Sequence, residues 1–233
     1  MVCSLLLFVE HMNMLSTWIF VLWGIVLTCQ ANSQSTIATI SVNGTSAIHV
    51  TDKRYLSFGM DSNTVRQHWV TFNFSSVRLR TLAKALAPAY LRLSGTDGDR
   101  LLFNVTDDQL RTFPSTTFSM SPSDWDNINK WCADVDWDLM FGFNNQQRFM
   151  MTNVSHWDPR NAMELLSYTV LQGYNDRLHF QLGNEPDRYH LRGWATILSG
   201  AEVAADFFAL RKILQTRIFR SFCYHWSRYI SHR

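Results

Sequence analysis

The chain has 233 residues, a formal net charge of +2 at pH 7, 46% hydrophobic residues and 14% aromatic residues. With only 10 Gly and 5 Pro, this composition excludes a disordered or collagen-like chain, because such chains lack the apolar residues that build a core. The small net charge gives no bulk attraction to nucleic acid, and the length alone predicts one domain.

The N-terminal segment predicts a secretory signal peptide. Residues 15–27 are almost wholly apolar, and small and polar residues follow up to Ser33. An apolar core of this length before Ala31 is typical of a signal peptide over residues 1–31, whereas a membrane span needs about 20 apolar residues. No Lys or Arg precedes the apolar run, so an uncleaved anchor is the alternative.

Four N-x-S/T sequons support the same route. They lie at Asn43, Asn73, Asn104 and Asn153, and sequons are glycosylated in the secretory pathway. We therefore expect a glycoprotein that is secreted to the extracellular space, delivered to the lysosome or held at the cell surface.

Two cysteines, Cys132 and Cys223, follow the signal peptide. The sequence allows two hypotheses for these cysteines. The pair forms a disulfide, or Cys132 is a small buried hydrophobic residue.

Residues 36–54 predict an N-terminal strand and hairpin. Apolar residues alternate with polar ones from Ile37 to Val42, and Asn43-Gly44 separates this run from Ala47–Val50. An Asn-Gly pair between two such runs is a strong hairpin signal.

Strand and helix patterns then alternate along the chain. Strands are predicted at residues 55–60, 89–93, 138–143 and 178–183. Helices are predicted from Ser76 to the stop at Pro88, from an N-cap at Ser123 through Trp131, from an N-cap at Asp158 to Gly173, and over residues 202–219.

This alternation predicts an α/β fold with a parallel sheet, because parallel neighbours need a crossover connection. The best fit is about the first four βα units of a TIM (β/α)8 barrel over residues 55–220, followed by a divergent basic and aromatic tail at 221–233. A doubly wound sheet is the alternative, but the sequence has neither G-x-G-x-x-G nor a P-loop.

Each predicted strand ends in polar residues. Asp61 and Asn63 follow the first strand and Thr96 the second, while Asn144 and Asn145 follow the third and Asn184 and Glu185 the fourth. The carboxyl ends of barrel strands form the active-site edge, so we expect a site there.

Glu185 is the candidate catalytic residue. Glycoside cleavage needs one carboxylic acid to protonate the leaving oxygen and a second carboxylate to attack or to activate water. Asn184, beside it, is suited to holding a sugar hydroxyl. The tripeptide Asn184-Glu185-Pro186 also fits a plain helix start, so the position at a strand end carries the argument.

Four segments resemble the heparanase family of retaining glycoside hydrolases, which cleave heparan sulfate as endo-β-glucuronidases. They are Arg80–Lys84, Pro88–Thr96, Trp137–Asn144 and Gln181–Pro186, and the similarity runs in order from Tyr55 to Arg220.

The resemblance implies a fold and a set of site residues. The fold is a TIM barrel with an appended β-sandwich, which the N-terminal hairpin would join. Glu185 would be the proton donor, and Asn184, Asp61, Asn63 and Thr96 would contact the glycan. The implied partner is heparan sulfate or a related acidic glycan, with membrane-surface or matrix association through proteoglycans; no nucleic acid partner is expected.

The sequence also departs from the family. Only a short stretch, Asn104–Ser121, stands where the enzyme precursors carry a long removable segment. The basic residues Lys53, Arg54, Arg100 and Arg188 are scattered rather than clustered, so a less sulfated uronic-acid polymer is an open alternative substrate.

The nucleophile of the family is a glutamate near the seventh strand. Three more βα units need on the order of 90 residues, but 48 follow Glu185, and no acidic residue follows Asp206. We expect the nucleophile and the missing half of the barrel to lie outside this chain, which alone would be inactive. The alternative is a non-catalytic glycan-binding or regulatory isoform.

Other chemistries find no support. Asp134, Asp136 and Asp138 have the spacing of a calcium loop, but Leu139 and Asn145 occupy its Gly and Glu positions, so solvated acids at a helix end are expected. H-E-x-x-H, C-x-x-C and G-x-S-x-G are absent. No metal and no cofactor are expected.

Overall fold

A computed structural model describes residues 40–41, 44–151, 154–174, 176–193 and 197–216. The chain divides into two units, Met1–Val50 and Thr51–Arg233, and all the helices and strands below belong to the second. The predicted signal peptide and the tail at 221–233 lie outside the described residues, as do Asn43, Asn153 and Cys223.

Four parallel strands form the main sheet. They are β1 (Ser57–Asp61), β2 (Ala89–Ser94), β5 (Trp137–Phe143) and β8 (Leu178–Leu182), in the order β1-β2-β5-β8. Each strand thus pairs with the next main-sheet strand along the chain. This is the α/β topology that the alternating pattern predicts, and it is the order of consecutive barrel strands; the closed barrel itself stays a prediction.

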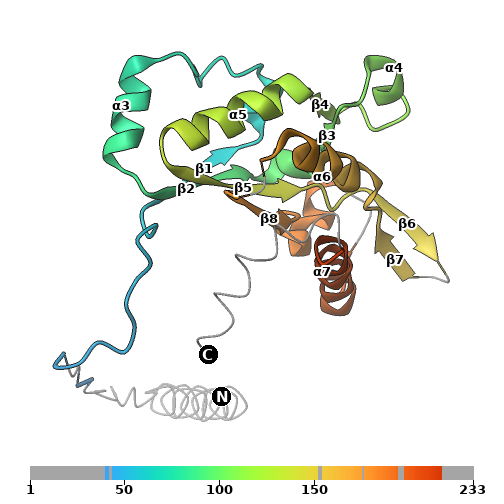
Figure 1. The fold of residues 1–233 in the computed structure, drawn as a ribbon. Helices are drawn as coiled ribbons and strands as arrows, with labels where there is room; N and C mark the ends of the chain where they lie inside the picture. The colour runs from blue at the N-terminus through green and yellow to red at the C-terminus, as the bar shows by residue number, and fades with distance from the viewer. Residues whose placement is uncertain (1–39, 42–43, 152–153, 175, 194–196, 217–233) are drawn as a thin grey trace, which may run out of the picture. The chain divides into compact units, whose positions relative to one another are not determined.

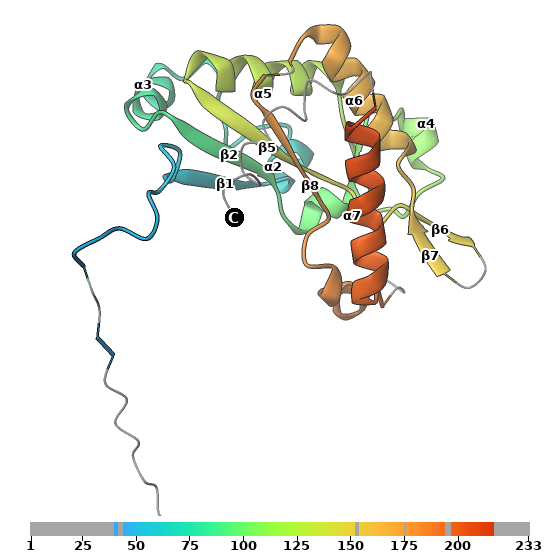
Figure 2. The ribbon, with the colours of Figure 1, turned by 60° about the horizontal axis from the view of Figure 1, so that its bottom comes forward.

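A helix connects each pair of neighbouring strands. The connections contain α3 (Val77–Ala85), α5 (Pro122–Asp134) and α6 (Arg160–Gln172), and a short α2 (Asn63–Arg66) follows β1. Figures 1 and 2 show α3, α5 and α6 on the same side of the sheet. The fourth long helix, α7 (Gly200–Leu214), packs against β8. None of the helices in the described ranges is long and apolar enough to cross a membrane.

The two faces of the sheet differ in chemistry. On β2, Leu91 and Leu93 are buried and belong to the hydrophobic core, which Trp125 of α5 also joins. Tyr90 and Arg92 alternate with them and therefore lie on the opposite face. The face without helices is thus polar, whereas the covered face is apolar.

Asp138 on β5 shows how this polar face is held together. Its carboxylate pairs with Nε of Arg54 at 3.1 Å and with Nε2 of His179 on β8 at 3.5 Å. Burial raises the pKa of Asp138, but the hydrogen bond with His179 and the charges of Arg54, His179 and Arg177 outweigh burial, so the net pKa is lowered. The prediction that this carboxyl is exposed to solvent was wrong. The Asp138 side chain is buried, because the alternation of side chains along β5 directs it toward the polar face of the sheet.

The other two acids of the predicted solvated group, Asp134 and Asp136, are exposed, as expected. Asp134 pairs with Arg80 and Lys84, and Asp136 pairs with Arg177. Cys132 is buried and free, which agrees with its reading as a small hydrophobic residue.

Helix boundaries follow local capping chemistry. Ser76 caps α3 as predicted, with its side chain accepting from the amide of Leu79. The predicted cap at Ser123 was wrong: Ser121 is the N-cap of α5, because Pro122 fills the first helical position and the Asp124 side chain completes a capping box. Near α6, Asp158 still accepts from the amide of Arg160 at 3.1 Å, although the helix begins one residue later than predicted.

The predicted N-terminal hairpin is not formed in the described part of residues 36–54. Residues 40–41 and 44–54 contain no strand, and Ile48 and Val50 are 103% and 82% exposed. A two-stranded hairpin buries too little surface to be stable alone, so its Asn-Gly signal needs a partner sheet to take effect.

Two small sheets were not predicted. The stretch Asn104–Ser121 contains a short helix, α4 (Asp107–Leu110), and leads from β3 (Leu101–Phe103) to β4 (Phe118–Met120), which pair in parallel. After β5, β6 (Arg148–Met151) and β7 (Val154–Trp157) form an antiparallel pair. These strands have three or four residues, too few for a visible period-2 pattern.

Candidate functional site

The carboxyl ends of β1 and β2 bring Asp61, Asn63 and Thr96 to one edge of the sheet. Asp61 is the last residue of β1, and its Oδ1 accepts from the amide of Asn63 at 2.8 Å. Ser62 then donates its amide to the carbonyl of Ser94 at 2.7 Å. These bonds fix the first strand end against the second.

Gly95 allows this close approach. Its φ is +105°, and a Cβ at this position would lie 2.0 Å from Oδ2 of Asp61. Only glycine tolerates both the backbone and the contact. Thr96 follows and begins a 3₁₀-helix, Thr96–Arg100. Two of the predicted glycan-contacting residues, Asp61 and Thr96, therefore flank the same glycine.

Glu185 lies at the same edge of the sheet, after β8. Its backbone is left-handed, with φ 51° and ψ 60°, a conformation that is uncommon for residues other than glycine and is enriched at functional sites. Its side chain is 47% exposed and forms an ion pair with Arg192. Nη1 of Arg192 also donates to the carbonyl of Asn184 at 3.2 Å. The turn thus presents the carboxyl to solvent beside a guanidinium.

Asn184 is joined to the polar face of the sheet. Its Oδ1 accepts from Nη2 of Arg92 at 3.1 Å, and Nε of Arg92 donates to Oε1 of Gln181 at 2.8 Å. Gln181 in turn donates to the carbonyl of Gly183 at 2.8 Å. Arg92 and Gln181 were not predicted as site residues, although their alternation with buried apolar residues is the signal that places them on this face.

Asp99 is a further candidate functional residue, which the sequence patterns did not predict. It is fully buried, and its carboxylate accepts from the amides of Asn145 at 3.0 Å and Asn184 at 2.8 Å. Burial raises the pKa of Asp99 to about 6, although its hydrogen bonds with the amides of Asn145 and Asn184 and its interaction with Tyr189 lower it. No local sequence signal distinguishes Asp99 from its neighbours in the turn after β2.

Two basic residues that the sequence offered for sulfate binding already have acidic partners. Arg54 pairs with Asp138, and Arg100 pairs with Asp97 at 3.1 Å. Lys53 and Arg188 are exposed. The described part of the chain contains no group of three or more His, Cys, Asp or Glu side chains that could hold a metal ion.

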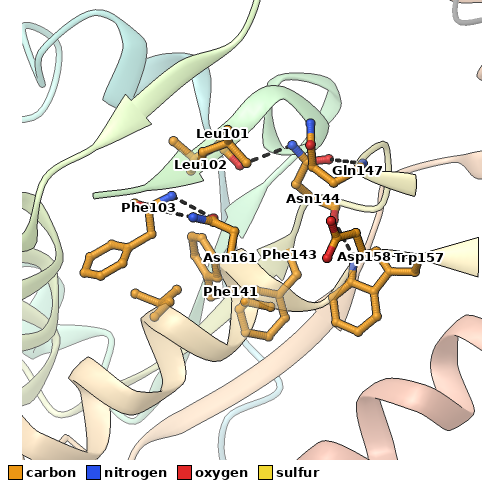
Figure 3. A pocket seen from close by; sticks show the side chains of 12 residues that line it. Leu101, Leu102, Phe103, Phe141, Phe143, Asn144, Gln147, Trp157, Asp158 and Asn161 are labelled. Carbon is orange, nitrogen blue, oxygen red and sulfur yellow. Dashed lines mark hydrogen bonds between the residues drawn. The ribbon is translucent and has the colours of Figure 1, made fainter. Parts of the chain in front are cut away.

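A cavity of about 20 Å³ lies beneath the ends of β5 and β3 and is lined mainly by apolar side chains (Figure 3). Asn144 and Asn161 hydrogen-bond to backbone groups of β3 along its wall. This volume suffices for one water molecule at most. It is therefore a packing gap. A larger cavity, of about 180 Å³, is lined by residues of α5, by Leu139 of β5 and by residues that follow α6, none of which is a predicted site residue.

The two described sequons are accessible. Asn73 and Asn104 are exposed, and Nδ2 of Asn104 donates to Oε1 of Glu164 at 3.0 Å. Their glycosylation stays a prediction.

Comparison with known proteins identifies the family. Residues 38–224 match the description "Glycosyl hydrolase family 79, N-terminal domain". The chain is 28% identical over 221 residues to the heparanase of Bos taurus, a match that covers 75% of this chain and 39% of the heparanase. It is 26% identical over 170 residues to the hyaluronoglucuronidase of Hirudo nipponia, which covers 63% of this chain and 34% of that protein.

A third relative carries a different name. The chain is 23% identical over 243 residues to "Inactive heparanase-2" of Homo sapiens, a match that covers 78% of this chain and 40% of the relative. The chain thus spans about two fifths of the length of the relatives it matches.

Proposed function

Because the chain belongs to glycosyl hydrolase family 79, we propose that its strand-end edge forms part of the active site of a glycosidase that acts on an acidic glycan. Glu185 is the proton donor in this proposal, and Asn184, Asp61, Asn63 and Thr96 contact the sugar chain. Relatives named as heparanases and as a hyaluronoglucuronidase support a uronic-acid polysaccharide as the substrate class, with heparan sulfate as the first choice.

The position of Glu185 carries the proposal. Its exposed carboxyl stands at the carboxyl end of a parallel strand, on a strained turn, at the edge where α/β barrels place their chemistry. Its proton passes to the glycosidic oxygen as the bond breaks. A second carboxylate attacks the anomeric carbon, and water then releases the covalent intermediate with Glu185 acting as base.

Among the described residues, Asp61 at the end of β1 supplies the exposed carboxylate at the end of a different main-sheet strand. Three spacings between neighbouring strands of about 4.8 Å give about 14 Å between the ends of β1 and β8 along the sheet, and about 12 Å through space for the curvature of an eight-stranded barrel. Retaining enzymes need about 5–5.5 Å between the two carboxyl groups, and inverting enzymes about 6.5–9.5 Å. We therefore propose that the nucleophile comes from a segment outside the described residues.

We propose glycan binding without cleavage as a second candidate function of the 233-residue chain. The spacing of these two exposed carboxyl groups favours it, and a relative that matches 78% of this chain carries the name "Inactive heparanase-2". We also propose passage through the secretory pathway, with glycosylation at the sequons and contact with matrix or membrane surfaces through proteoglycans.

The test compares the 233-residue chain, expressed alone, with any longer product of the same gene. Release of reducing ends from heparan sulfate and hyaluronan measures cleavage, and calorimetry with a heparan sulfate oligosaccharide measures binding. We expect Glu185→Gln to abolish cleavage by the longer product and to leave binding within about threefold. Asp187→Asn, which alters an exposed carboxyl two residues away, is the matched control and should leave both unchanged.

The outcomes separate the two candidate functions. Unchanged turnover in Glu185→Gln removes Glu185 from its role. Binding without cleavage by the 233-residue chain supports the second function for that chain. Cleavage by the 233-residue chain contradicts the proposal that its nucleophile lies elsewhere.

A further inference from the structure

Both ends of the turn that carries Glu185 are attached to one buried carboxylate. Asn184, immediately before Glu185, donates its amide to Oδ2 of Asp99 at 2.8 Å. The phenol of Tyr189, four residues after Glu185, lies beside the same carboxylate and interacts with it electrostatically. Residues on both sides of Glu185 in the sequence therefore contact Asp99.

The same carboxylate also holds the neighbouring strand end. Oδ1 of Asp99 accepts from the amide of Asn145 at 3.0 Å, directly after β5. Asp99 itself follows β2, inside the 3₁₀-helix Thr96–Arg100. One side chain therefore ties the ends of β2, β5 and β8 together at the active-site edge.

Packing leaves this turn little freedom. Gly183 has a φ of +68°, and a Cβ there would lie 2.8 Å from the hydroxyl of Tyr189 and 2.9 Å from Cβ of Asn145. Tyr189 is 1% exposed and Asn145 is fully buried. The backbone on the N-terminal side of Glu185 is thus enclosed by the same side chains that surround Asp99.

Asp99 cannot act on the substrate directly. Its side chain is fully buried, and both of its oxygens accept hydrogen bonds from backbone amides. A buried carboxylate is costly unless its hydrogen bonds compensate for the lost solvation. The two oxygens of the Asp99 carboxylate accept from amides at two different strand ends, and this explains why a carboxylate is buried here.

We propose that Asp99 is a positioning residue, which sets the direction of the Glu185 carboxyl by holding the backbone of Asn184 and the phenol of Tyr189. The consequence for catalysis rests on the proposed role of Glu185 as proton donor, whereas the positioning of the turn does not. Asp99→Asn keeps the size of the side chain but replaces one acceptor oxygen by a donor, so one amide loses its partner.

The first measurement is amide hydrogen exchange in the full chain. We expect Asp99→Asn to reduce the protection of the Asn145 or Asn184 amide by at least about tenfold, the factor that corresponds to one lost hydrogen bond to a charged group. Tyr189→Phe, which removes only the phenol contact, should reduce protection at Asn184 less. Asp138→Asn removes another buried carboxylate, at the other end of the sheet, and should leave both amides protected.

Unchanged protection in Asp99→Asn, or an equal loss in Asp138→Asn, would overturn the positioning role. The second measurement is cleavage of heparan sulfate by the longer product of the same gene. We expect the Asp99→Asn substitution to lower kcat by about 10- to 100-fold with KM within about threefold, because a misplaced catalytic group slows the chemical step. A loss through KM alone contradicts the proposal.

The two proposals fail in different ways. A wild-type product that cleaves neither heparan sulfate nor hyaluronan contradicts the proposed function, and the exchange measurement then still decides whether Asp99 holds the turn.

Discussion

Asp99 gives the protein a pH-dependent stability whose sign and size follow from its burial. Its pKa is about 6 in the folded protein, against an ordinary value of 3.8, and desolvation by burial is the main cause. Because the folded state binds this proton more tightly, the stabilising contribution is fully present below about pH 3.8 and is lost as the pH rises through about 6. The difference corresponds to about 3 kcal/mol.

The Asp99→Asn variant isolates this contribution. At pH 7 the substitution removes the cost of a buried charge but leaves one amide without an acceptor, which costs about 1–3 kcal/mol, so the two effects nearly offset each other. At pH 4 only the second effect remains, and the variant is less stable than the wild type. We expect the free-energy difference between the two proteins to change by about 2 kcal/mol between pH 4 and pH 7, because at pH 4 the unfolded carboxyl is already more than half ionised.

Urea unfolding at a series of pH values measures this difference, since every other titrating group cancels between the two proteins. Asp138→Asn is the control with the opposite sign. The folded pKa of Asp138 is lowered despite burial, so its contribution is present at neutral pH and is lost as the pH falls. A difference between wild type and Asp99→Asn that is constant from pH 4 to pH 7, or that changes in the opposite direction, would refute this reasoning.

Three further predictions concern buried residues. Gly183→Ala should destabilise the protein by about 2–4 kcal/mol in urea unfolding, because a Cβ meets two atoms closer than 3.0 Å and the backbone has a positive φ of +68°. Gly173→Ala, at a similar φ of +76° but with open space around it, should cost only about 1 kcal/mol. Asp206→Ala should cost about 3–5 kcal/mol, because it leaves the guanidinium of Arg148, its partner at 2.6 Å, buried and unpaired; a loss below 1 kcal/mol would contradict this. Cys132 should react with a thiol reagent only on unfolding, because burial raises the pKa of its thiol; rapid labelling of the native protein would show that the site opens.

The order of the main elements could be predicted from local patterns. Apolar alternation locates β2 and β5, and a helical period with a serine cap locates α3. These signals are strong because each depends on residues within one or two turns of the chain. The cap of α5 was misplaced by two residues because two serines flank Pro122, and the proline decides between them.

Segments that depend on distant partners could not be predicted. β6 and β7 are short, and they are held by Arg148, which bonds to Ser155 and to Asp206 of α7. The N-terminal segment shows the converse: its residues have a clear hairpin pattern, but the described part of that segment forms no strand.

The sequence by itself determined that Glu185, Asn184, Asp61 and Thr96 end parallel strands, because the carboxyl ends of such strands meet at one edge. Only the tertiary structure decided what holds them there. Asp99 bonds to amides 46 and 85 residues further along the chain. No local pattern carries contacts of that range, since they arise only when three strand ends are brought together and water is excluded from between them.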